Sequence, residues 1–210
     1  DGAFYNAGQS CCAVERIYVE RPIYDRFVEA FVEKTRAYRL GDPMDAATSI
    51  GPLAAKGQPA FLVGQVADAV ARGGRLVVDP ASFDTPKQGW FYAPAVVADA
   101  PQDSALMAEE SFGPVIGILP VSGDEEAVRL MNDSPYGLTA SIWTSDPARA
   151  ARVGARVETG TFFMNRCDFL DPALPWTGVK DTGRGATLSR YGLLQLTQLK
   201  SMHLRVELPK

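Results

Sequence analysis

Residues 16–38 read RIYVERPIYDRFVEAFVEKTRAY, a strand-like segment followed directly by an amphipathic one. Residues 16–19 are rich in side chains that favour strands, and Pro22 then precedes apolar side chains that recur at helical spacing. Proline in the first turn and Gly41 beyond the last turn are typical helix boundaries. The stretch therefore predicts a strand and then a helix over residues 23–38.

The same alternation continues along the chain. Strands that alternate with helices of about 10–16 residues indicate βαβ units and a mostly parallel sheet. We therefore expect an α/β fold with three layers and a protruding C-terminal strand. Further strands are expected at 75–78, 95–97, 115–119, 140–143, 161–164 and 199–208, and further helices at 60–71, 124–131 and 145–157.

The segments between these elements are predicted to be loops. Residues 41–58 and 166–189 are rich in Gly, Pro and small or acidic side chains, and the second segment has the character of a functional loop. Residues 79–90 are polar and are expected to form an exposed excursion. Asp124 is a candidate N-cap for the helix that follows it.

Composition excludes several classes of protein. The formal net charge of −4 and the pI of about 5.1 provide no basic surface for nucleic acid or an anionic membrane. No apolar run approaches the roughly 20 residues that span a bilayer, and the first residues lack the pattern of a signal peptide. Three cysteines, two of them adjacent, do not form a disulfide framework. We expect a cytoplasmic protein with neither a nucleic-acid nor a membrane partner, and without a metal site.

Residues 4–12, FYNAGQSCC, carry the first chemical signal. A cysteine nucleophile reacts as the thiolate, so its protein must lower a pKa of about 8.5. Small neighbours let a carbonyl approach the sulfur, and nearby backbone N–H groups can hold an oxyanion. A free cysteine is, however, more often a small buried hydrophobe. The residues alone leave both readings open.

The string FYNAGQSC resembles the active-site signature of the NAD(P)-dependent aldehyde dehydrogenases. The resemblance places the nucleophile on Cys11, and Cys12 then occupies a position that the family fills variably. Cys167 matches no catalytic position and is expected to be structural. The resemblance also implies that Phe4 lines the aldehyde pocket.

A second string, residues 109–115 (EESFGPV), resembles the family pattern Glu-x-Phe-Gly-Pro. In the family this pattern supplies a glutamate to the nicotinamide ribose and an aromatic ring beside the nicotinamide. The resemblance assigns these roles to Glu110 and Phe112, and a carboxylate is well suited to accept hydrogen bonds from two ribose hydroxyls. The other reading is simply a helix end, a turn and a strand.

Further matches follow in the family's order along almost the whole chain, which favours the resemblance over chance. In the Pro-Phe-Gly-Gly-like loop, Trp176 replaces the usual Phe and Thr177 a usual Gly. Trp176 is expected to line the aldehyde pocket, or equally to pack beneath the loop. The other matching segments are residues 132–138 (NDSPYGL), 160–165 (GTFFMN), 175–180 (PWTGVK) and 191–206.

The resemblance implies a mechanism in which a thiolate forms a thiohemiacetal, hydride passes to NAD or NADP, and a glutamate base activates water against the resulting thioester. In relatives the base, the oxyanion Asn and the cofactor domain precede the cysteine. We therefore expect most of the cofactor site in an upstream domain before Asp1, and a fragment that cannot complete turnover alone. The expected domains are a catalytic domain over 1–192 and a C-terminal segment over 193–210 with an oligomerisation strand.

Three functions remain open. The first is the catalytic part of a homo-oligomeric dehydrogenase that oxidises a small-molecule aldehyde to a carboxylic acid. The second is a non-catalytic assembly module that uses the terminal strand, and the third is a thiol esterase with residual activity at Cys11. The sequence does not specify the aldehyde, the choice between NAD and NADP, the origin of the short chain or the oligomeric state.

Overall fold

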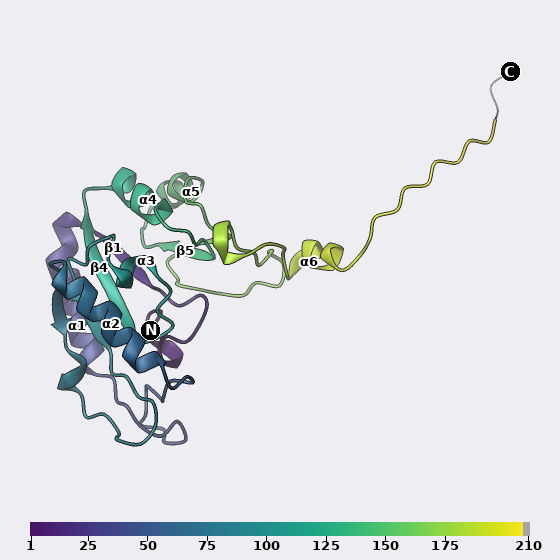
Figure 1. Cartoon of the computed structure of the whole chain (residues 1–210). Helices are drawn as coiled ribbons and strands as arrows, with labels where there is room; N and C mark the ends of the chain where they lie inside the picture. The colour runs from purple at the N-terminus through teal and green to yellow at the C-terminus, as the bar shows by residue number, and fades with distance from the viewer. Residues whose placement is uncertain (208–210) are drawn as a thin grey trace.

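The computed structural model describes residues 1–207 as alternating strands and helices (Figure 1). The α/β prediction is confirmed, and most predicted strands agree with the structure to within a few residues. The strands are β1 (Arg16–Glu20), β2 (Arg75–Val78), β3 (Ala95–Ala98), β4 (Val115–Val121), β5 (Thr139–Ile142) and β6 (Thr161–Met164).

The helices also follow the predicted order, with shorter ends. Residues Arg21–Ile23 form a 3-10 turn, so the first α-helix begins only at Tyr24. A short helix in the acidic segment before residue 109 and another after residue 188 were not predicted. The helices are α1 (Tyr24–Arg36), α2 (Gln58–Ala71), α3 (Ala105–Ala108), α4 (Asp124–Asn132), α5 (Pro147–Gly154) and α6 (Ser189–Gln195).

Two sheets organise these strands. The larger sheet has the order β1-β4-β3-β2, and the smaller one pairs β5 with β6. Only the β2–β3 pairing is antiparallel, with a register irregularity between Leu76 and Val78. The expectation of a mostly parallel sheet is therefore confirmed.

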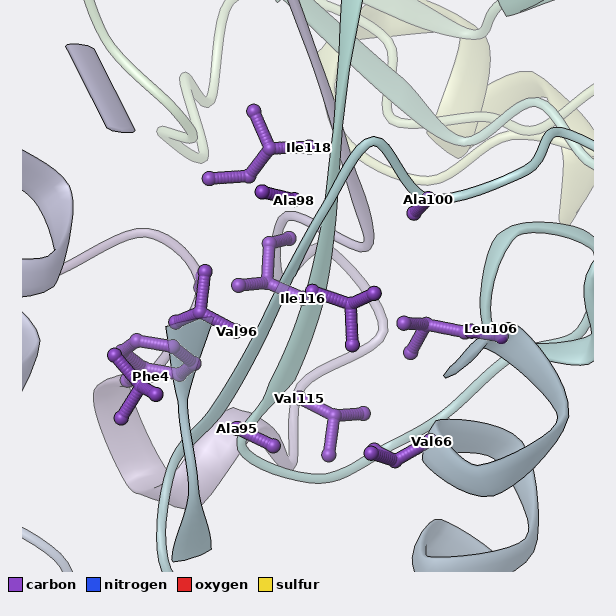
Figure 2. Close-up of a cluster of buried hydrophobic side chains, with 14 of the residues drawn as sticks. Phe4, Val66, Ala95, Val96, Ala98, Ala100, Leu106, Val115, Ile116 and Ile118 are labelled. Atoms are coloured by element: carbon purple, nitrogen blue, oxygen red, sulfur yellow. The ribbon is translucent and has the colours of Figure 1, made fainter. Parts of the chain in front are cut away.

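The centre of the larger sheet is buried on both faces, which explains its apolar sequence. All four residues of β3 are buried, because α1 packs against β1 and β2 while α2 and α3 pack against β2, β3 and β4. Figure 2 shows Phe4 and Val96 on one side of the strands, and Val66, Leu106 and Val115 on the other. This arrangement gives the three layers expected from the sequence.

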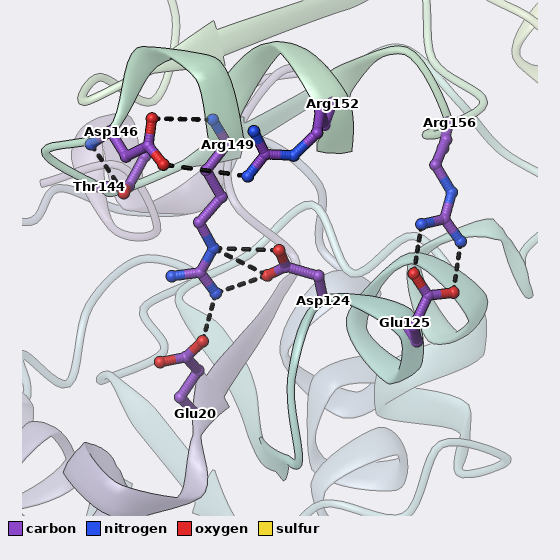
Figure 3. Close-up of polar contacts among 8 residues, drawn as sticks. All are labelled: Glu20, Asp124, Glu125, Thr144, Asp146, Arg149, Arg152 and Arg156. Atoms are coloured by element: carbon purple, nitrogen blue, oxygen red, sulfur yellow. Dashed lines mark hydrogen bonds and ion pairs between the residues drawn. The ribbon is translucent and has the colours of Figure 1, made fainter.

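Arg149 of α5 joins the smaller sheet's layer to the larger sheet (Figure 3). Its guanidinium forms an ion pair with Glu20 at the end of β1. A second ion pair, of 2.5 Å, joins it to Asp124. The hydrogen bonds from Arg149 lower the pKa of Asp124. The predicted N-cap role of Asp124 is wrong, because Gly123 occupies the N-cap position and Asp124 turns toward Arg149 instead.

The C-terminal part of the described chain leaves the body of the molecule (Figure 1). Helix α6 crosses the predicted domain boundary at residues 192 and 193, and residues 198–206 form neither helix nor strand. The predicted strand over 199–208 is therefore not formed within this single chain, and Leu208 lies outside the described residues. A strand needs a hydrogen-bonded neighbour, so pairing across subunits stays a prediction.

No helix of the described residues has the length and apolar character that a bilayer crossing requires.

Substituting Arg149→Ala should lower the free energy of unfolding by about 1–2 kcal/mol, because two carboxylates lose a charged hydrogen-bond partner in a partly exposed site. Urea denaturation measures the change. Arg152→Ala is the matched control on the same helix, since Arg152 approaches Asp146 only to 3.9 Å and both side chains are largely exposed. An equal loss in both variants would contradict a specific role for Arg149.

Candidate active site

The loop that carries Cys11 has an unusual backbone. Asn6, Ala7 and Gly8 have successive φ angles of 52°, 56° and 71°, in the left-handed region that non-glycine residues rarely adopt. Asn6 and Gln9 stabilise the turn, because each side-chain amide donates to the other's backbone carbonyl, at 2.9 and 3.2 Å. Strained backbone persists only where its surroundings hold it, and such strain concentrates at functional sites.

Gln9 also connects this loop to the segment before α2. Its side-chain oxygen accepts the Ala54 backbone N–H at 2.8 Å, and its amide nitrogen lies 3.5 Å from the Pro52 carbonyl oxygen. The Gln9 side chain therefore forms hydrogen bonds within its own turn and with residues 52 and 54, and these bonds fix the turn that leads into Cys11.

Gly8 brings the second sequence motif against the first. A Cβ at Gly8 would lie 2.2 Å from the carbonyl oxygen of Gly113, so only glycine permits this approach. The contact places residues 109–113 beside the cysteine loop. Cys11 and Glu110 are thereby brought close enough for the carboxylate to influence the thiol.

Glu15 makes a second connection between the two motifs. Its carboxylate accepts the backbone N–H of Ser111 at 3.2 Å and that of Phe112 at 3.3 Å. Burial raises the pKa of Glu15 despite these hydrogen bonds. Sequence reasoning missed this residue, because a single acid before a strand carries no distinguishing signal.

Cys12 belongs to a polar cluster with Tyr5, Ser10 and Asp168. The Tyr5 hydroxyl lies 2.6 Å from the Ser10 hydroxyl and 2.8 Å from the Asp168 carboxylate. The Cys12 sulfur lies 3.3 Å from Ser10 Oγ and 3.5 Å from Asp168. Burial, and next the neighbouring Cys12, raise the pKa of Tyr5. Asp168 thus holds the late loop against the cysteine motif, which the sequence did not reveal.

Cys11 differs from its neighbour in exposure, because Cys11 is exposed whereas Cys12 is half-buried. Burial of part of the thiol raises the pKa of Cys11, and Cys12 and Glu110 add to the effect. The described residues therefore present an accessible thiol but do not activate it. A thiolate would need an additional positive charge, dipole or base.

Glu110 and Phe112, the residues assigned to the cofactor, both lie at the surface, on the segment that Gly113 brings against the cysteine loop. Glu110 is exposed, and the Phe112 side chain is 38% exposed although its neighbour Ser111 is fully buried. Phe112 has a φ of 50°, which is unusual for an aromatic residue.

The two residues assigned to the aldehyde pocket, Phe4 and Trp176, have different surroundings in the structure. Phe4 is 2% exposed and packs edge-to-face against Phe31 and Tyr38, so it is a core residue rather than a pocket residue. Trp176 is half-buried and pairs with Thr187 through two backbone hydrogen bonds of 2.8 and 2.9 Å. Its place in the aldehyde pocket stays a prediction.

Cys167 is half-buried and lies against Gly2, where an added Cβ would meet its sulfur at 2.4 Å. Burial raises the pKa of the Cys167 thiol, and its structural role stays a prediction. Among residues 1–207 no group of three or more His, Cys, Asp or Glu side chains is arranged to hold a metal ion.

A profile of the aldehyde dehydrogenase family matches residues 1–202. The chain belongs to the aldehyde dehydrogenase family. It is 40% identical over 197 residues to a succinate-semialdehyde dehydrogenase [NADP(+)] of Mycobacterium avium (strain 104), which covers 94% of this chain and 41% of the relative. It is also 34% identical over 205 residues to a putative aldehyde dehydrogenase-like protein of Schizosaccharomyces pombe, with 98% and 40% covered.

Solved structures of the family agree with the fold. An aldehyde dehydrogenase from Mycobacterium tuberculosis complexed with NAD+ superposes with a TM-score of 0.90 at 34% identity, over 100% of this chain and 43% of that one. An NAD+ complex of an aldehyde dehydrogenase from Bacillus cereus superposes with a TM-score of 0.91 at 31% identity, over 98% of this chain and 42% of that one. The chain therefore spans about two fifths of the length of these family members.

Gly8→Ala should destabilise the chain by at least about 2 kcal/mol, because alanine is strained at a positive φ and its Cβ meets the Gly113 carbonyl. Urea denaturation measures the loss. Gly64→Ala is the control: Gly64 lies inside α2 with open space around it, so alanine should be neutral or stabilise by up to about 1 kcal/mol. A tolerated Gly8→Ala would refute the close approach of the two loops.

Alkylation of Cys11 at neutral pH should be slower in the folded chain than in the urea-unfolded chain. A thiol whose folded pKa is raised has a smaller thiolate fraction below that pKa, and only the thiolate reacts. The rate should approach that of the unfolded chain as the pH rises. Site-resolved mass spectrometry after iodoacetamide treatment measures both rates, and a faster reaction in the folded chain at neutral pH would contradict the prediction.

Proposed function

We propose that this chain is the catalytic part of an NAD(P)-dependent aldehyde dehydrogenase in which Cys11 is the nucleophile. The observation that carries the proposal is the position of Cys11. Cys11 is exposed on a strained loop, whereas Cys12 is half-buried and lies 3.3 Å from Ser10 Oγ and 3.5 Å from the Asp168 carboxylate. The contact between Gly8 and Gly113 brings the segment that carries Glu110 and Phe112 against the cysteine loop.

The surface next to Cys11 is suited to the nicotinamide end of a dinucleotide. Glu110 offers an exposed carboxylate that could accept hydrogen bonds from two ribose hydroxyls, and Phe112 offers a partly exposed aromatic ring. The cofactor, when bound, accepts a hydride from the substrate. The Mycobacterium avium relative is named for NADP, and two similar structures contain NAD+, so we propose either nucleotide as the cofactor.

The proposed chemistry at Cys11 is covalent. The Cys11 thiolate adds to the aldehyde carbonyl carbon and forms a thiohemiacetal. Loss of hydride from that carbon leaves a thioester on Cys11, which water then cleaves to release the carboxylic acid. The raised pKa of Cys11 and the adjacent Glu110 carboxylate disfavour the thiolate, so we propose that the chain needs groups outside the described residues for efficient turnover.

The proposed substrate is a small aldehyde of undefined structure. Residues 166–172 lie against the cysteine loop through Asp168, and we propose that this loop and Trp176 shape the approach to Cys11. The relative from Mycobacterium avium is named for succinate semialdehyde, which makes that aldehyde the first to test.

The exposed tail is proposed to serve assembly in the cytoplasm. Apolar side chains follow α6 at high exposure, including Leu199 at 87% and Val206 at 96%. Exposed apolar residues in an unpaired extended segment favour pairing with a second copy of the chain.

The test joins this chain to the cofactor-binding part of the Mycobacterium avium relative and measures NAD(P)H formation with succinate semialdehyde and with neutral aldehydes. Cys11→Ala should lower kcat at least about a thousandfold, because the covalent intermediate is proposed to form on the Cys11 sulfur. Cys12→Ala is the matched control and should retain most of the activity.

The labelling pattern of the unmodified chain provides a second readout. Iodoacetamide should modify Cys11 before Cys12 and Cys167, as their burial predicts. A chimera that keeps its activity after Cys11→Ala would refute the proposed nucleophile. A chimera that is folded but inactive with every aldehyde would favour the assembly role instead.

A further inference from the structure

The loop of residues 109–113 contains an unfavourable backbone conformation, which contacts with other segments must stabilise. Phe112 has a φ of 50°, a strained conformation for a residue other than glycine. The loop also approaches Gly8 so closely that no side chain fits between them. Its conformation must therefore be held by contacts with other segments.

Glu15 supplies contacts at the strained peptide. Both of its carboxylate oxygens lie 3.2 Å from the Ser111 nitrogen, and one lies 3.3 Å from the Phe112 nitrogen. Two successive N–H groups thus donate to one carboxylate. Such charge-assisted hydrogen bonds are stronger than those between neutral groups.

Gln58 holds the same segment from the opposite side. Its side-chain amide, at the start of α2, donates to the Ser111 carbonyl at 2.5 Å. Ser111 is fully buried between these two contacts. Its N–H and its carbonyl are each fixed by a side chain from a different part of the chain.

The charge of Glu15 is not explained by an ion pair within residues 1–207, where its carboxylate meets backbone N–H groups instead. Burial raises its pKa, whereas the two N–H groups favour the ionised form. The Glu15 side chain is half-buried, and its carboxylate faces the backbone of residues 111 and 112. Its position, four residues after Cys11 on the same segment, connects the thiol to residues 109–113.

We propose that Glu15 is a positioning residue, which holds residues 109–113 in the conformation that presents Glu110 and Phe112 beside Cys11. This inference rests on the proposed dehydrogenase function for its consequence, because the presented surface is the one assigned to the nicotinamide end of NAD(P). Loss of Glu15 should weaken cofactor binding while the thiol stays accessible.

The first experiment is amide hydrogen exchange on the 210-residue chain and its Glu15→Gln variant. Glutamine keeps the size of the side chain but turns one acceptor into an NH₂ donor, which opposes the N–H groups of Ser111 and Phe112. Exchange at these two amides should accelerate at least about tenfold, while the amides of β4 stay unchanged. Unchanged protection at both amides would overturn the proposal.

Glu109→Gln is the matched control. Glu109 is the first residue of the same loop. Its side chain is exposed and makes no hydrogen bond within the described residues. Its variant should leave the exchange rates of Ser111 and Phe112 as they are. If Glu15→Gln also exposes β4, the whole domain has loosened, and Glu15→Asp replaces it. Aspartate keeps the charge but is one methylene shorter, so the same local acceleration is expected, and an unchanged rate again refutes the role.

The second experiment measures kinetics in the chimera described above. Glu15→Gln should raise KM for NAD(P) about tenfold or more, with a smaller effect on kcat and with iodoacetamide labelling of Cys11 unchanged. If the Ser111 and Phe112 amides exchange faster but KM for NAD(P) is unchanged, the positioning role is rejected. Hydrogen exchange needs no turnover, so an inactive chimera would refute the proposed function while the result for Glu15 is still obtained.

Discussion

The close approach of two backbones, at Gly8 and Gly113, is the constraint on which the candidate site depends. Without it the exposed thiol and the Glu-Ser-Phe-Gly-Pro segment would be unrelated features of the surface. The approach requires a glycine at a positive φ, and the two residues before Gly8 must adopt the same rare conformation. Glu15 of the cysteine-bearing segment and Gln58 of α2 then bond to Ser111 from the second loop, and Gln9 bonds the cysteine loop to Ala54.

The larger sheet supplies the rigid support for these loops. Glu15 directly precedes β1, and Pro114 directly precedes β4, and the two strands are hydrogen-bonded neighbours. The loops that enter adjacent parallel strands lie at the same edge of a sheet. The sheet therefore determines that residues distant in sequence meet, and side-chain contacts determine how closely they meet.

Much of this fold was predictable from sequence, because apolar runs and helical periodicity are local properties. The pattern of residues 16–38 and the buried runs at β3 and β4 specify their elements directly. The exceptions are tertiary in origin. Asp124 has the chemistry of an N-cap, but a distant arginine offers a stronger partner. The terminal strand has the composition of a strand, but no neighbouring strand within this chain.

The site divides in the same way. The roles proposed for Cys11, Glu110 and Phe112 come from short motifs that resemble those of the family, and the structure brings these motifs together. Phe4 was assigned to a pocket, although its ring packs in the core against α1. Glu15 gave no signal, and Asp168 was included only in the predicted functional loop 166–189, because their contacts join residues separated by roughly half or more of the chain. Such contacts cannot be inferred from single residues in one sequence.

The junction between the two sheets differs in kind from the interior of the larger one. The main buried cluster extends from Ala3 to Ile118 and, within the described chain, includes no residue of α4, α5, β5 or β6. Arg149 adds a charged contact between these elements and β1, beside the hydrogen bonds that Tyr18 and Gln102 donate to the Leu130 carbonyl of α4. Partly exposed charges are screened by dissolved ions, whereas apolar burial is not. Ionic strength can therefore act on the attachment of the smaller sheet while it leaves the support beneath Cys11 intact.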